Sequence, residues 1–177
     1  MKKRFAGAFL ALAMLLSLLP ISAFAVGTDE ESATGSVTYG GQTYSTLADA
    51  VAEIHKATGA DRMQDHLITL TDNVTCAGFA VGYQSLTPNE GGFATTSGNN
   101  PVNITIDLGG HTYTVSNLPT VGSGGTESNT FQFLQNSKVT IKNGSITSET
   151  TNFLFQNYCD LTLENVNVTA TVARQVF

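Results

Sequence analysis

Two stretches, FQFLQNSKVTIKNGSIT (residues 131–147) and FLFQNYCDLTLENVNVT (residues 153–169), repeat one pattern of residue types at an offset of 22. Without a gap they match at six positions, which are Phe131 with Phe153, Phe133 with Phe155, Val139 with Leu161, Ile141 with Leu163, Asn143 with Asn165 and Ile146 with Val168. A repeat of this length, made of short runs that alternate apolar and polar residues, predicts strands that stack coil upon coil.

Apolar-polar-apolar runs of the same kind precede the repeat. Strand cores are expected at residues 67–70, 104–108, 139–141 and 161–163. From residue 104 to residue 139 the interval is 35, which exceeds one coil of 22 by 13 residues, and a Gly- and Ser-rich loop, VGSGGTESN, accounts for this surplus. We therefore expect an all-β parallel β-helix, a solenoid with coils of about 22 residues. An antiparallel β-sandwich is the alternative, although it does not predict a fixed offset. Residues 77–100 show no clear strand pattern.

Equivalent residues of stacked coils should form ladders at the strand spacing of about 4.8 Å. Phe131 would then lie over Phe153, and Asn143 over Asn165. Asparagine tolerates left-handed backbone geometry, and stacked amides would satisfy polar groups at a corner. The two asparagines could instead be turn residues without a ladder, which would leave the repeat intact.

The N-terminal 25 residues have the pattern of a secretory signal peptide: three cations, an apolar run, and Ala23-Phe24-Ala25 as a cleavage site. Residues 26–36 are acidic and small, which predicts a flexible linker. Export leaves five cations against all 14 acidic residues, a net charge near −9. Because few cations remain to neutralise phosphates, nucleic acid is excluded as a partner, and membrane insertion after cleavage is not expected.

Residues 37–66 are expected to cap the N-terminal end of the coils, which would span residues 67–177. Two short β-type runs flank Gly40-Gly41 and predict a tight hairpin. A helix is predicted at about residues 46–58, with Thr46 as N-cap and Gly59 as its stop. Its apolar face consists of Leu47, Ala50, Val51 and Ile54, spaced i, i+3, i+4 and i+7.

The two cysteines, Cys76 and Cys159, would lie about three coils apart, or roughly 14 Å along the axis. A disulfide requires Cα atoms within about 7 Å. We therefore predict two free, mostly buried thiols.

The chain resembles the pectin-lyase-like family of right-handed parallel β-helix proteins, especially secreted or surface proteins of gut-type Gram-positive bacteria. The resemblance covers residues 37–177. It rests on YSTLADAVAEI as the capping helix, ITIDLGGHTYTV as the first full strand-turn-strand, and the coils KVTIKNGSIT and DLTLENVNVT. Family members include polysaccharide lyases, glycoside hydrolases and non-catalytic adhesins, so the resemblance implies a right-handed coil and leaves activity open.

Catalysis in such a family would require clustered carboxylates. A calcium-dependent lyase site needs acidic residues from neighbouring coils, and hydrolysis needs two carboxylates about 5–9 Å apart. The coils carry Asp107, Asp160 and Glu164, but no two occupy equivalent positions in adjacent coils. Their expected role is therefore at a solvated strand face or turn.

The remaining polar candidates are isolated in the sequence. His111 lies in the turn GGHTY, His55 on the predicted helix and His66 at a strand entry, and none has cysteine or aspartate at metal-ligand spacing. Arg62 and Arg174 form no cluster for an acidic sugar. We predict no catalytic residue, no cofactor-binding residue and no metal site.

Aromatic side chains are the remaining candidates for ligand binding. Tyr83, Phe93, Tyr113 or Tyr158 could stack on a sugar ring if exposed, and the loop at 121–130 could contact a partner. Each is more often a packing residue, so no binding site is assigned from the sequence.

These patterns predict a secreted or cell-surface structural or binding module without catalysis, whose partner would be an extracellular glycan or a host or cell-surface protein. The alternative is the N-terminal part of a polysaccharide lyase or glycoside hydrolase whose active site follows residue 177. The chain stops after the last repeat with an apolar tail. We therefore expect a longer polypeptide, or self-association through an uncapped C-terminal end.

Overall fold

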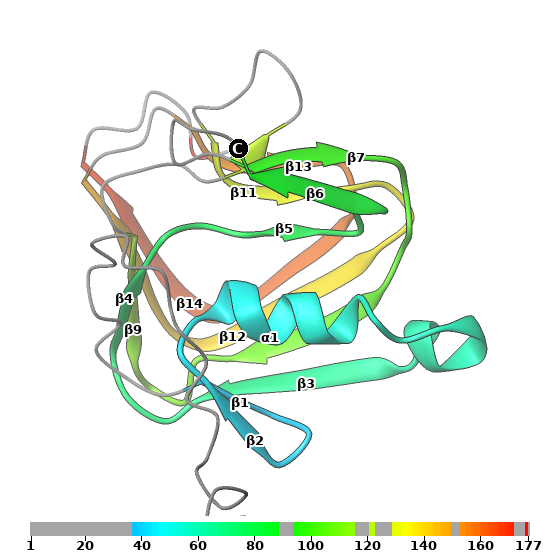
Figure 1. Ribbon diagram of the computed structural model, residues 1–177. Coiled ribbons are helices and arrows are strands. Elements are labelled where there is room, and N and C mark those ends of the chain that lie inside the picture. Colours follow the sequence, from blue (N-terminus) through cyan, green and yellow to red (C-terminus); the bar gives the residue numbers. More distant parts are fainter. Residues whose placement is uncertain are drawn as a thin grey trace, which may run out of the picture. The chain divides into compact units, whose positions relative to one another are not determined.

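The computed structural model describes residues 37–88, 94–115, 121–122, 129–149, 153–171 and 176 (Figure 1). All of them lie in one compact unit, residues 31–177. The predicted signal peptide and linker fall outside the described residues. The elements are β1 (Val37–Tyr39), β2 (Gln42–Tyr44), α1 (Leu47–Ile54), a 3₁₀ helix (Gly59–Met63), β3 (Asp65–Leu70), β4 (Val74–Cys76), β5 (Ala80–Val81), β6 (Ser85–Pro88), β7 (Ala94–Ser97), β8 (Asn103–Asp107), β9 (Thr112–Val115), β10 (Val121–Gly122), β11 (Asn129–Phe133), β12 (Lys138–Ser148), β13 (Phe153–Asn157) and β14 (Asp160–Ala170).

The larger sheet, sheet A, contains the repeat. Strands β3, β8, β12 and β14 follow one another in parallel, and β4 and β9 extend the same sheet around a corner. The long strand β12 pairs with β8 along its first half, with β9 along its second half, and with β14 throughout. Figure 1 shows β12 and β14 running side by side.

The predicted offset of 22 is confirmed within sheet A. Val139 pairs with Leu161 and Ile141 with Leu163. Further along the same two strands, Asn143 of β12 and Asn165 of β14 adopt left-handed backbone angles, with φ of 59° and 54°. Asparagine adopts this conformation at lower cost than most residues, so each one turns its strand to a new direction without ending the ladder.

The predicted fold class is nevertheless wrong. Sheet A is a mixed, curled half-barrel, because the hairpin β1–β2 joins it antiparallel to β3. The smaller sheet B also contains antiparallel pairs, β6 with β7 and β10 with β11. A regular parallel solenoid would require every pair to be parallel. The antiparallel sandwich fails as well, since β3, β8, β12 and β14 are parallel neighbours.

The repeat changes its offset in sheet B, which corrects the predicted aromatic ladder. Phe131 pairs with Phe155 rather than with Phe153, an offset of 24. The cause is the length of the connections between the two sheets. Residues 134–137 join β11 to β12, whereas only residues 158–159 join β13 to β14. The second coil therefore reaches sheet A two residues sooner, and the register of sheet B shifts by two.

Helix α1 forms where its apolar spacing predicts it. Thr46 is the N-cap, and its hydroxyl accepts a hydrogen bond from the backbone N–H of Asp49 at 3.0 Å. The helix ends at Ile54, earlier than the predicted residue 58, because the N–H groups of Lys56 and Ala57 bond to carbonyls three residues back in a 3₁₀-type turn. Its buried residues are Leu47, Ala50, Val51 and Ile54, as predicted.

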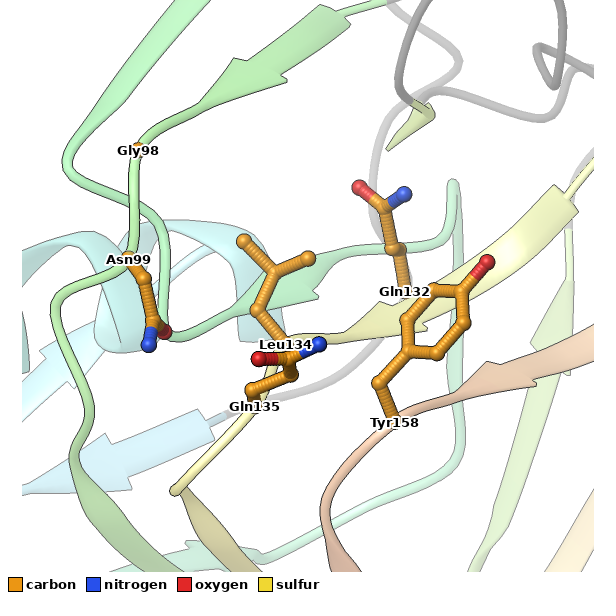
Figure 2. Close-up of a pocket in the computed structure, with 6 residues that line it drawn as sticks. All are labelled: Gly98, Asn99, Gln132, Leu134, Gln135 and Tyr158. Carbon is orange, nitrogen blue, oxygen red and sulfur yellow. The ribbon is translucent and has the colours of Figure 1, made fainter.

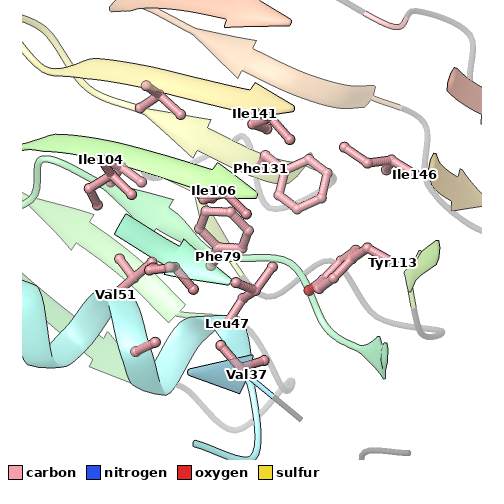
Figure 3. Packing of buried hydrophobic residues seen from close by; sticks show 14 of the residues in the cluster. Val37, Leu47, Val51, Phe79, Ile104, Ile106, Tyr113, Phe131, Ile141 and Ile146 are labelled. Atoms are coloured by element: carbon pink, nitrogen blue, oxygen red, sulfur yellow. The ribbon is translucent and has the colours of Figure 1, made fainter. Parts of the chain in front are cut away.

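The hydrophobic core lies between helix α1 and the two sheets. Figure 3 shows Leu47 and Val51 of the helix near Ile104 and Ile106 of β8, with Phe131 beyond them. All five side chains are buried. Full burial of such a side chain contributes about 1.5–3 kcal/mol to folding, so this cluster accounts for much of the stability of the unit.

Both cysteines are free, as predicted from their separation. Cys76 is buried, and its thiol donates a hydrogen bond to the hydroxyl of Tyr113 at 3.1 Å. Cys159 is only partly buried.

Candidate ligand-binding groove

An open groove of about 250 Å³ lies at one edge of sheet B, where the connections between the two sheets begin (Figure 2). The groove takes residues from three segments that are distant in sequence: the loop after β7, the end of β11 with its following turn, and the residue after β13. Its lining residues are Gly98, Asn99, Gln132, Leu134, Gln135 and Tyr158.

Tyr158 is the aromatic wall of the groove and is 53% exposed. Its backbone is fixed on both sides. The N–H of Tyr158 donates to the carbonyl of Phe133 at 2.9 Å, and the Asn157 side chain accepts from the N–H of Cys159 at 3.1 Å, which closes a turn around the tyrosine. An exposed ring held in this way loses little conformational entropy when a ligand stacks on it.

A network of side-chain amides lies behind the ring. The Gln156 amide donates to the Tyr158 hydroxyl at 2.9 Å, and its oxygen accepts from both Asn129 and Gln132 at 2.7 Å. The oxygen of Gln132 in turn accepts from the hydroxyl of Thr96. The phenol oxygen acts as an acceptor here, so its own hydrogen remains a donor for another partner.

The opposite side of the groove is built by two turns. Asn136, with φ of 64°, supplies the left-handed residue of the turn that presents Gln135. Gly98, with φ of 71°, allows the other loop to pass close to Gln84, because a Cβ atom at this position would lie 2.4 Å from the Cβ of Gln84. In Figure 2, Asn99 and Tyr158 lie on either side of Leu134, which forms the apolar floor.

Among the described residues that line the groove, none carries a carboxylate, ammonium, guanidinium or imidazole group. Their polar side-chain atoms belong to amide groups and one phenol, which can donate and accept hydrogen bonds while remaining uncharged. These residues offer no counter-ion to a charged ligand. The groove therefore suits a neutral ligand with hydroxyl groups and one flat apolar face.

Of the four aromatic residues proposed from the sequence, Tyr158 alone is both described and exposed. Tyr83 is 8% exposed and stacks on His55 with ring centroids 4.1 Å apart. Tyr113 is 1% exposed and lies in the core. Phe93 falls outside the described residues, as does most of the loop at 121–130.

The three acidic residues that were considered for catalysis are kept apart. Asp107 and Glu164 occupy equivalent ladder positions, but Lys142 of the intervening strand β12 lies between them. Lys142 forms an ion pair with Asp107 at 3.5 Å. Partial burial opposes ionisation of Asp107, but hydrogen bonds from Gly109 N–H and Asn143 and the charge of Lys142 lower its pKa. A carboxylate that is ionised and accepts hydrogen bonds has no proton to give, so Asp107 is poorly suited to act as a general acid.

Asp160 lies farther along the ladder, where it pairs with Lys138. The histidines are also dispersed. His55 lies just after helix α1, His66 accepts or donates one hydrogen bond with Tyr39 at 2.9 Å, and His111 lies in a turn. Within the described ranges, no three His, Cys, Asp or Glu side chains gather in a way that could hold a metal ion.

Arg62 is used structurally. Its guanidinium donates to the backbone carbonyls of His55, Ala57 and Asn100, at distances of 2.6–3.3 Å. These carbonyls follow helix α1 or lie beside the groove loop, so the side chain joins the cap to the sheets. Arg174 falls outside the described residues.

The amide network was missed at the level of the sequence. Its signal is the dipeptide Phe-Gln, which occurs at residues 131–132 and again at 155–156, an offset of 24 rather than 22. Aligned at this offset, Gln132 pairs with Gln156 across two parallel strands. An alignment of the two stretches at an offset of 24, beside the one at 22, predicts both the glutamine pair and the shift in register.

None of the helices in the described ranges has the length and apolarity of a membrane-spanning segment. Comparisons of the chain with protein-family models, with curated proteins and with solved structures found no significant match.

Proposed function

We propose that the protein is an extracellular binding module without catalytic activity, and that its groove at Tyr158 binds a neutral carbohydrate. Export rests on the signal-peptide pattern of residues 1–25. The observation that carries the ligand class is the exposed, doubly anchored ring of Tyr158 beside uncharged amides.

The chemistry of a sugar ring matches this arrangement. One face of a pyranose is covered by C–H groups and packs against an aromatic ring, while its hydroxyl groups need both donors and acceptors. Tyr158 supplies the flat surface, and the side chains of Asn99 and Gln135 supply amides in the lining of the groove. A volume of about 250 Å³ is below the usual range of about 300–1,000 Å³ for enclosed ligand sites, so the groove suits a single sugar unit.

Selectivity should depend on charge. With a net charge near −9 after export, the protein repels acidic glycans, and the described residues of the groove include no cation that would compensate. We therefore expect neutral polysaccharides to bind more tightly than polygalacturonate.

The test is electrophoresis of the purified protein in native gels that contain a series of neutral polysaccharides, or polygalacturonate. The Tyr158→Ala variant should bind a polysaccharide that retards the wild type about two- to tenfold more weakly, since stacking on one ring is worth about 0.5–1.5 kcal/mol. Tyr158→Phe, which keeps the ring, should retain most of the binding.

The matched control is Leu67→Ala, which removes another exposed apolar side chain, 51% exposed, on strand β3 of sheet A, whereas the groove lies at sheet B. It should leave retardation unchanged. Equal retardation of the wild type and Tyr158→Ala would contradict the proposed site. Release of sugar fragments by the purified protein, with or without Ca²⁺, would contradict the absence of catalysis.

A further inference from the structure

Strand β14 forms an open edge of sheet A. It pairs with β12 on one side, and no strand in the described part of the chain pairs with its other side. The edge is 11 residues long and contains neither proline nor lysine, the residues that commonly protect exposed edges. The described tail residue Val176 bonds instead to Phe155 of β13, in sheet B.

The exposure of equivalent residues changes sharply from β12 to β14. The inward aliphatic residues of β12, Val139, Ile141 and Ile146, are at most 2% exposed. Their partners on β14, Leu161 and Val168 among them, pack against the same core but remain partly exposed. A strand with neighbours on both sides is covered, so this contrast agrees with β14 having only one neighbour among the described strands.

The sequence of β14 suits a second copy of itself. Its inward residues, Leu161, Leu163, Val166 and Val168, are arranged symmetrically about the midpoint between Glu164 and Asn165. Two copies that run antiparallel about this midpoint would place Leu161 opposite Val168, and Leu163 opposite Val166. Directly opposite residues of an antiparallel pair lie on the same face, so aliphatic residues would meet aliphatic residues throughout. The corners of the two strands would coincide as well.

Charge favours the same register. Both acidic residues of β14 would face uncharged partners in the second copy, Glu164 facing Asn165 and Asp160 facing Thr169. Like charges directly opposite each other would destabilise a strand pair, and this register avoids them.

The other edges of sheet A make a head-to-tail arrangement unfavourable. They are β2 (Gln42–Tyr44) and β4 (Val74–Cys76), strands of three residues each. Pairing β14 with either of them would leave most of the long edge uncovered, whereas pairing β14 with β14 covers residues 160–169. A contact between identical surfaces also closes after two copies.

We propose that the protein forms a two-fold symmetric dimer through antiparallel pairing of β14 with β14, centred between Glu164 and Asn165. This interface is independent of the groove at Tyr158.

The test is sedimentation equilibrium of the purified protein over a range of concentrations. The outward residues Thr162 and Asn167 lie opposite each other in the proposed register, so a pair of substitutions probes the register itself. The double variant Thr162→Glu, Asn167→Glu places two glutamates opposite each other, and the two-fold symmetry repeats this contact. Its dimer dissociation constant should be about tenfold higher or more. Thr162→Lys with Asn167→Glu places opposite charges together and should restore dimerisation to near the wild-type level.

Gln42→Glu with Thr43→Glu on β2 is the control for head-to-tail contact and should leave the dimer unchanged. Circular dichroism of each variant at a dilute, monomeric concentration checks that the monomer fold is intact. A wild type that stays monomeric at all concentrations would overturn the proposal, as would dissociation by the β2 variant or equal weakening by both charge pairs.

Discussion

The ring of Phe131 stacks on the ring of Phe155, with centroids 5.0 Å apart and planes inclined by 27°. The two residues are partners in neighbouring strands of sheet B and belong to a cluster of aromatic rings that includes Phe79. This contact shows that the aromatic part of the repeat follows an offset of 24 while the aliphatic part follows 22.

A double-mutant cycle tests the stacking. Phe131→Leu and Phe155→Leu should each destabilise the protein, and the double variant should lose about 0.5–1.5 kcal/mol less than the sum of the two. Unfolding in urea supplies the free energies. Phe131→Leu combined with Tyr44→Leu, a partly buried residue on β2, is the control pair and should be additive. Additivity for Phe131 and Phe155 would show that the rings are not coupled.

The corner at Asn143 should be sensitive to side chains that disfavour a left-handed backbone. Asn143→Ala is expected to lower the free energy of unfolding by about 1–2 kcal/mol, and Asn143→Gly by less, since glycine adopts a positive φ freely. Asn143 also donates to Asp107, at 3.2 Å, so glycine should not restore full stability. Urea unfolding of both variants provides the measurement, and equal losses would contradict a backbone origin.

The stability of the protein should fall as the pH decreases through about 6.5. His55 stays neutral in the fold, because its Nδ1 donates to the Val51 carbonyl at 2.7 Å and its Nε2 accepts from the N–H of Gly82 at 2.9 Å. Burial lowers the pKa of His55, the charge of Arg62 lowers it further, and the bond to Val51 only partly opposes this.

The sign follows from the lowered pKa. The unfolded chain, in which a histidine has a pKa of about 6.5, binds a proton that the folded chain excludes, so the contribution of His55 is complete above this pH and is lost as the pH falls towards the folded pKa. Urea unfolding at pH 7.5, 6.5 and 5.5 measures the effect. His55→Gln should flatten the dependence, and an unchanged slope in that variant would assign it to other groups.

The two thiols should react slowly and in a fixed order. Burial, with the neighbouring charge of Asp160, raises the pKa of Cys159 to about 11, and burial also raises the pKa of Cys76. Since the thiolate is the reactive form, Cys159 should be alkylated about a hundredfold more slowly than an unperturbed thiol at pH 8. Cys76, only 7% exposed, should react after Cys159.

Mass spectrometry of the protein during treatment with iodoacetamide would resolve the two steps. Cys159→Ser should remove the first step and leave the second unchanged. Rapid alkylation of both residues at neutral pH would contradict their environments in the fold.

The sequence predicts well those features that a short segment determines by itself. The spacing of Leu47 to Ile54 places helix α1, and the alternation in residues 138–142 and 160–164 places their strands and their register. Asn143 was predicted as a corner because left-handed geometry is intrinsic to asparagine.

Features that depend on the lengths of connections or on which edges meet were not predicted. The shift from Phe153 to Phe155 arises from two missing residues between strands, and the antiparallel hairpin β1–β2 joins β3 through contacts that no local pattern encodes. The groove combines residues 98–99, 132, 134–135 and 158, which are distant in sequence, so the sequence pointed only to Tyr158, as one of four aromatic residues.

The connections at 134–137 and 158–159, which differ in length, contribute to the groove and lead into the paired strands of sheet A. Sheet A keeps an offset of 22 between β12 and β14 although the two connections that lead into these strands differ in length. Insertions or deletions in these connections would therefore reshape the groove that we propose as a carbohydrate site, while the paired strands of sheet A stayed intact. Changes at these few positions could alter the ligand that such a groove accepts without a change of scaffold.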